Sequence, residues 1–163
     1  MNKNSERFSR RKREGLFSAV SIGIFLILVG MFFVITPDLL DKIVSFFQDF
    51  QIMEVPRTGI PLPAPANPHQ HSIVYSVVKD FSLIWGVFLV VLLALRFIAD
   101  SPLRKKAENL SDILFSFGVV YLVDSLLIRA TQWFEFWAWI LILAGVSLVI
   151  RAIFLAAFSM RPQ

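Results

Sequence analysis

The residues best placed to do chemistry are charged side chains that lie inside apolar stretches. Asp124 sits one to two helical turns inside the end of an apolar run rich in Phe, Val and Leu. An isolated carboxylate in hydrocarbon is costly, so it is expected to be protonated or paired. Lys79 lies at a comparable depth in the preceding apolar run, which must travel in the opposite direction. We therefore predict a Lys79–Asp124 pair.

The neighbours of this pair could extend it into a polar cluster. Tyr121 and Ser125 are close enough along one helix to contribute hydrogen bonds, and Asp80 and Arg129 are expected nearer the water. Two interpretations stay open. The cluster is either a structural ion pair that sets helix register, or a proton relay or ligand site, since ionisable residues within membranes often mark function.

Two histidines form a second candidate, a metal site. His69 and His71 are separated by one residue, and paired imidazoles can bind copper, nickel or zinc. Glu54 or a partner would have to supply further ligands, because metal sites usually need three or four. Solvated histidines in a flexible loop are the simpler interpretation.

Other catalytic patterns are missing from the sequence. It has no phosphate-binding Gly-rich loop, nucleophile elbow, His-Glu-x-x-His or EF-hand pattern. It has no cysteine, which excludes disulfides and Cys nucleophiles. We expect no catalytic residues, no enzymatic activity and no cofactor.

The elements that carry these residues are long apolar helices. Hydrophobic residues make up 56% of the 163 positions and charged residues 17%, whereas soluble domains average about 45–50% and 25%. The apolar residues gather in blocks long enough to cross a bilayer. The predicted fold is an all-α integral membrane protein, a small left-handed bundle of four transmembrane helices with one interfacial helix. The predicted spans are residues 16–36, 73–99, 110–129 and 136–158.

Four other segments accompany the spans, and three of them lie within the single transmembrane domain that is predicted for residues 16–163. Residues 1–15 read as a flexible basic tail. Residues 38–50 have apolar positions at helical spacing and predict an amphipathic helix on lipid or on the bundle. Residues 51–72 contain five prolines, which favour extended backbone and predict an exposed outer loop. Residues 100–109 read as a short basic loop.

Lys and Arg are unevenly distributed between the two sides of the membrane. Six of the 16 lie in the tail and four in Arg96–Lys106, while Arg151 and Arg161 add two more on the same side. The positive-inside tendency then places both termini in the cytoplasm and the protein in the cytoplasmic or plasma membrane. The net charge is +4, but the basic residues lie beside the apolar blocks, so we expect no nucleic-acid partner.

Small residues recur every seven positions in three of the spans, a spacing that favours close left-handed helix packing. The residues are Gly23 and Gly30; Ser111, Gly118 and Ser125; Ala138, Gly145 and Ala152. These seams serve packing within the chain, or one of them faces a partner protein or a second copy.

Three functions are compatible with this sequence. The first is a non-enzymatic membrane protein that acts through helix–helix contacts, as an accessory subunit or a homo-oligomer. The second is a small proton- or ion-coupled transport protein that uses Asp124 and Lys79. The third and weakest is metal binding by His69 and His71.

Overall fold

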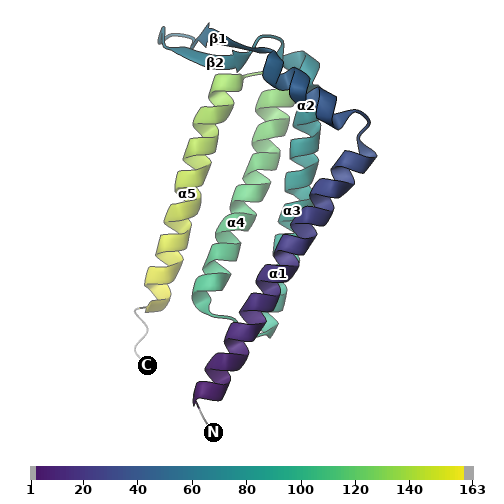
Figure 1. Cartoon of the computed structure of the whole chain (residues 1–163). Coiled ribbons are helices and arrows are strands. Elements are labelled where there is room, and N and C mark those ends of the chain that lie inside the picture. The colour runs from purple at the N-terminus through teal and green to yellow at the C-terminus, as the bar shows by residue number, and fades with distance from the viewer. Residues whose placement is uncertain (1–2, 160–163) are drawn as a thin grey trace.

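The computed structural model describes the backbone of residues 3–159 and the side chains of residues 15–157. Within these limits the protein is mostly helical (Figure 1). The elements in chain order are α1 (Lys3–Ile35), α2 (Leu39–Gln48), β1 (Phe50–Glu54), β2 (Pro61–Pro65), the 3-10 turn η1 (Pro68–His71), α3 (Ser72–Ile98), α4 (Leu103–Leu122), the π-helical η2 (Val123–Arg129) and α5 (Trp133–Ser159).

The described residues include four helices long and apolar enough to cross a membrane, as predicted. They cover Gly15–Ile35, Pro68–Ile98, Leu103–Arg129 and Trp133–Ala157. The chain is therefore a polytopic integral membrane protein. A helix of about 20 residues suffices for one crossing, and each of these is at least that long.

Two boundaries differ from the sequence prediction. The backbone of the tail is helical from Lys3 and continues into the first span, where a flexible segment was predicted. The loop predicted at residues 100–109 is mostly helix, because α4 begins at Leu103 directly after Pro102. Buried Ala107 and Asn109 explain the longer helix, since packing rather than hydropathy holds this polar first stretch in place.

The long helices lie side by side, and their main contacts follow the order α1, α3, α4, α5 (Figure 1). Phe25 of α1 packs edge-on against Phe81 and Trp85 of α3, with ring centroids 5.5 and 5.7 Å apart. Gly86 of α3 lies against Ser116 and Phe117 of α4. The central helices α3 and α4 thus form the middle of the fold, and α1 and α5 form its edges.

One end of the helices is covered by α2 and a β-hairpin (Figure 1). The predicted amphipathic helix is present, with Leu39 buried and Phe46 in ring contact with Tyr75 and Trp133. Leu40 and Phe47 stay exposed on its other face. The helix therefore packs on the protein with one face and presents an apolar face outward.

The Pro-rich segment, which is predicted as an exposed outer loop with extended backbone, forms a β-hairpin. β1 and β2 pair antiparallel, with Phe50 opposite Pro65 and Glu54 opposite Pro61. Prolines alternate along β2, at Pro61, Pro63 and Pro65, so the non-proline residues between them keep donors for β1. The extended backbone was predicted correctly, and its pairing was not.

Candidate functional site

The charged cluster predicted around Asp124 lies where α4 changes into η2. Asp124 Oδ1 is 3.3 Å from Lys79 Nζ of α3, and Asp124 Oδ2 is 2.8 Å from Arg129 Nη2. The contact predicted between Lys79 and Asp124 is therefore present. Both carboxylate oxygens face a cation, so the carboxylate links α3 to both ends of the π-helical segment.

Solvent exposure differs among the three side chains. Lys79 and Asp124 are 29% and 27% exposed, whereas Arg129 is 76% exposed. The π-helical segment that carries Asp124 is anchored in the protein, because Val123 and Leu127 on either side of Asp124 belong to the hydrophobic core. The lysine contact is therefore the better fixed of the two, and the arginine contact is a surface pair of small energetic value.

The other predicted members of this cluster do not bind the carboxylate. Tyr121 is 70% exposed and Asp80 is also exposed. Within the described part of the chain, neither Tyr121 nor the half-buried Ser125 donates a hydrogen bond to Asp124. Their place in a functional cluster stays a prediction.

The two histidines have separate partners. His71 is buried, and its Nε2 lies 2.9 Å from Asp49 Oδ2. His69 is exposed, with its Nε2 3.5 Å from Thr131 Oγ1. A metal site that used both imidazoles would have to bind His71 through Nδ1, because its Nε2 already faces Asp49. Among the described residues no group of three or more His, Cys, Asp or Glu side chains is placed to hold a metal ion.

Asp49 is a polar centre that the sequence did not point to. Besides His71, its carboxylate accepts a hydrogen bond of 2.7 Å from the Asn67 backbone N–H and one of 2.9 Å from Asn67 Nδ2. These bonds join the end of α2 to the segment before α3. The hydrogen bonds from Asn67 and His71 hold the pKa of the Asp49 carboxyl below its ordinary value of 3.8.

This shift predicts a pH dependence for the hairpin end. The folded state binds a proton on Asp49 less readily than the unfolded state, so the stabilisation is present at neutral pH and is lost as the pH falls below about 4. We expect Asp49→Asn to unfold at a lower temperature than the wild type near neutral pH, and the difference to shrink on acidification. Thermal unfolding in detergent measures both. Asp41→Asn, an exposed change on α2, is the control, and a difference that stays constant with pH would contradict the assignment.

A second polar set lies at the opposite end of the helices. Glu108 of α4 accepts from Arg151 Nη2 of α5 at 2.6 Å and from Lys105 Nζ at 2.9 Å. The hydroxyls of Ser111 and Ser147 are 2.6 Å apart, and each donates to the other residue's carbonyl. These contacts tie α4 to α5 through groups that are otherwise costly in lipid.

The small-residue seams divide into an inward and an outward set. On α4, Ser111 bonds to Ser147 and Gly118 lies against Leu143, so this seam packs on α5. Apart from their own helices, Gly23, Gly30 and Gly145 have no described atom within 4 Å of the position that a Cβ would take. Ala138 and Ala152 on the seam of α5 are exposed as well. The edge helices therefore present their seams outward.

Comparisons of the chain with protein-family models, with curated proteins and with solved structures find no match.

Proposed function

We propose that this protein is a non-enzymatic membrane protein that works through lateral helix contacts, as a subunit of a larger membrane complex or as a homo-oligomer. The interacting surfaces are the outward seams of its edge helices α1 and α5. The proposal rests on one contrast, between a glycine seam that is filled within the chain and similar seams that are left open.

The filled seam is that of α4, where Gly118 brings α5 close enough for Leu143 to contact the helix backbone. The open seams are on α1 and α5, where only 6% of each apolar span is buried in the fold, against 28% for the third span. Small side chains promote association in lipid because they let two helix backbones approach closely. The seven-residue spacing of small residues that serves packing on α4 therefore recurs on α1 and α5, where no other part of the described chain packs against it.

The polar groups between the central helices support a structural role. Ser116 Oγ donates to the Ser82 carbonyl at 2.7 Å, and Asn109 Nδ2 donates to the Leu89 carbonyl at 2.7 Å. Together with the serine pair, these bonds hold α3, α4 and α5 in one arrangement. Groups that are satisfied by each other stabilise a framework and are not poised to react with a substrate.

Thiol cross-linking tests the proposal, because the natural chain has no cysteine and each introduced thiol is unique. We expect Gly145→Cys to form cross-links in native membranes several-fold faster than Val146→Cys. Val146 is exposed at the same depth, but it points about 100° around the helix. A disulfide-linked dimer would identify a homo-oligomer, and a photo-cross-linker on the same thiol, followed by mass spectrometry, would identify a different partner. Equal cross-linking at the two positions would contradict a contact through this seam.

One observation favours proton- or ion-coupled transport as a second candidate. Asp124 lies in a π-helical segment, a rare backbone form that is often found at functional sites. A carboxylate there, flanked by Lys79 and Arg129, has the composition of a proton relay. The transport hypothesis makes Asp124 essential for flux, and the framework hypothesis makes it essential only for folding.

A further inference from the structure

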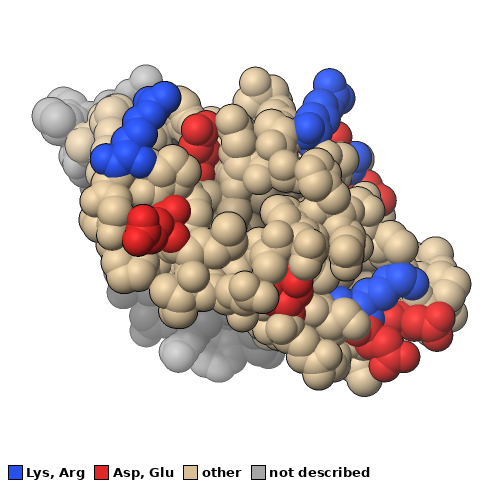
Figure 2. All heavy atoms as spheres, turned by 90° about the horizontal axis from the view of Figure 1, so that it is seen from above, with Lys and Arg blue, Asp and Glu red and all other residues tan. Residues whose placement is uncertain are grey.

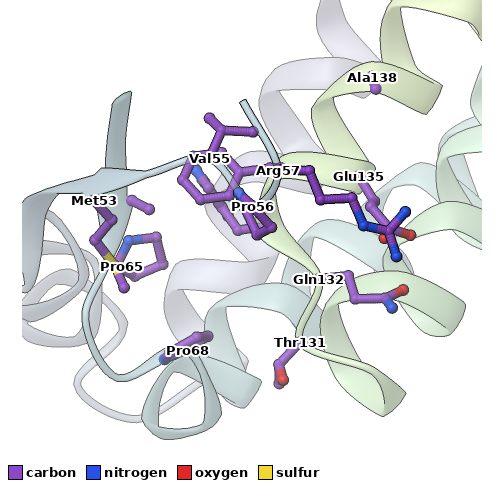
Figure 3. A pocket seen from close by; sticks show the side chains of 13 residues that line it. Met53, Val55, Pro56, Arg57, Pro65, Pro68, Thr131, Gln132, Glu135 and Ala138 are labelled. Carbon is purple, nitrogen blue, oxygen red and sulfur yellow. The ribbon is translucent and has the colours of Figure 1, made fainter. Parts of the chain in front are cut away.

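A groove at the hairpin end lies between the hairpin and the first turns of α5 (Figure 3). Its volume is about 520 Å³, within the range of about 300–1,000 Å³ that is typical of small-molecule sites. Its lining is mainly apolar. Prolines of the hairpin segment, including Pro56 and Pro65, form one side. Aromatic residues at the start of α5, including Trp133 and Phe134, form the other.

The walls of this groove are fixed by hydrogen bonds. Trp133 Nε1 donates to the Pro63 carbonyl at 3.2 Å, which ties the hairpin to α5. The turn that carries Arg57 is closed by a bond of 2.9 Å from the Val55 N–H to the Ile60 carbonyl. Arg57 itself has a φ of 70°, in the left-handed region. The groove is therefore a preformed feature and not a gap between independent segments.

The groove crosses the boundary of a membrane span. Ala138 lines it and lies within the fourth span, Trp133–Ala157, whereas Arg57 belongs to the hairpin beyond the spans. Trp133 and Trp137 at this level are typical of the lipid headgroup region, where aromatic belts form. A molecule in the groove would therefore have one part among headgroups and one part in hydrocarbon, which is the chemistry of a membrane lipid.

The charges of the groove fit a headgroup that carries both signs. Arg57 and Glu135 line the groove, and Figure 3 shows their charged ends at the same side of it. One guanidinium and one carboxylate complement a phosphate and an ammonium group. The face seen in Figure 2 is compatible with this choice, because its basic side chains are interspersed with acidic ones. Anionic lipids, in contrast, are bound by clusters of cations.

We propose that this groove binds a zwitterionic phospholipid that carries a primary amine, of the phosphatidylethanolamine class. The guanidinium of Arg57 binds the phosphate, the carboxylate of Glu135 accepts hydrogen bonds from the ammonium group, and an acyl chain descends past Ala138. A quaternary ammonium has no N–H to donate to Glu135, so the site distinguishes the amine from choline. The site shares Ala138 with the outward seam of α5, whereas Arg57 and Glu135 are not part of that seam.

Native mass spectrometry of the full-length protein in detergent tests the proposal. Delipidated protein is titrated with phosphatidylethanolamine, phosphatidylcholine and phosphatidylglycerol of identical acyl chains. We expect phosphatidylethanolamine to bind most tightly, and Arg57→Gln and Glu135→Gln each to weaken it roughly tenfold, the effect of losing one charge-assisted hydrogen bond. Arg104→Gln, an exposed arginine at the other end of the helices, is the matched control and should bind normally.

A further variant separates the site from general effects of charge. Ala138→Phe fills the part of the groove that lies within the membrane span and keeps both charges. We expect it to weaken the binding of phosphatidylethanolamine. Three results would overturn the proposal: equal affinity for all three lipids, equal affinity of Arg57→Gln and the wild type for phosphatidylethanolamine, or tighter binding of phosphatidylglycerol. The first would mean only unspecific lipid contact, and the last would mean a site for anions.

Discussion

Gly118→Val is expected to destabilise the protein by about 1–3 kcal/mol, the usual effect of overpacking a close helix contact. A Cβ at Gly118 would lie 2.5 Å from Leu143 Cδ2 and 2.6 Å from Leu143 Cδ1, so the end of the leucine side chain would have to shift. The leucine end could rotate away from a single methyl group, but valine adds two further methyl groups with restricted rotamers. The helices α4 and α5 would then move apart, which stretches the Ser111–Ser147 hydrogen bonds. Thermal or denaturant unfolding in detergent measures the loss.

Gly145→Val is the matched control, because the same substitution is made at a position where no described atom outside α5 lies within 4 Å of the new Cβ. We expect it to leave the free energy of unfolding nearly unchanged and, if the proposed lateral contact is correct, to weaken assembly. Adding Leu143→Ala to Gly118→Val should recover part of the lost stability, because it removes the clashing atoms. Equal destabilisation by the two glycine substitutions would show that the packing contrast between the seams is not real.

The membrane spans could be predicted from the sequence because hydrocarbon thickness sets a length that apolar runs must match. Their ends could not be predicted equally well. At Leu103 the helix begins in a polar stretch, because Ala107 and Asn109 are buried against neighbouring helices. The hairpin was not predicted because prolines remove backbone donors, a pattern that normally argues against a strand. In β2 the prolines occupy alternate positions, so the residues between them can still pair with β1.

The charged pair could be predicted because antiparallel helices bring residues of equal depth together, which is the relation between Lys79 and Asp124. The bonds of Asp49 could not, because they depend on how the hairpin returns to the start of α3 and places Asn67 and His71 beside the carboxylate. The partner of Glu108 on α5, Arg151, lies 43 positions away and became identifiable only with the register of α4 against α5. Equal depth on antiparallel helices was therefore informative, whereas contacts that depend on an irregular segment or on the register of α4 against α5 could not be predicted.

Substitutions at Lys79 and Asp124 are expected to be damaging singly and less so together. Asp124→Asn leaves Lys79 without its carboxylate in a partly buried position, and Lys79→Gln leaves Asp124 with only the exposed Arg129. Removing one member of such a pair generally harms stability more than removing both, since a lone charge has lost its partner but keeps its desolvation. We therefore expect a lower unfolding temperature for each single variant and a partial recovery in Lys79→Gln/Asp124→Asn. Arg129→Gln, at the exposed end, should change little.

The same variants decide between the two functions when proton flux is measured in liposomes. The framework hypothesis predicts that wild-type vesicles and all variant vesicles leak protons at the rate of protein-free vesicles, while stability follows the pattern above. A proton relay requires the opposite combination: measurable flux in the wild type, and its loss in an Asp124→Asn protein that remains folded. Asp124 Oδ1 faces Lys79 and Asp124 Oδ2 faces Arg129, so a relay would also have to break one of these two contacts during proton transfer. Asp124→Glu keeps the charge but moves it by one methylene group, so it should retain flux in a relay better than asparagine does.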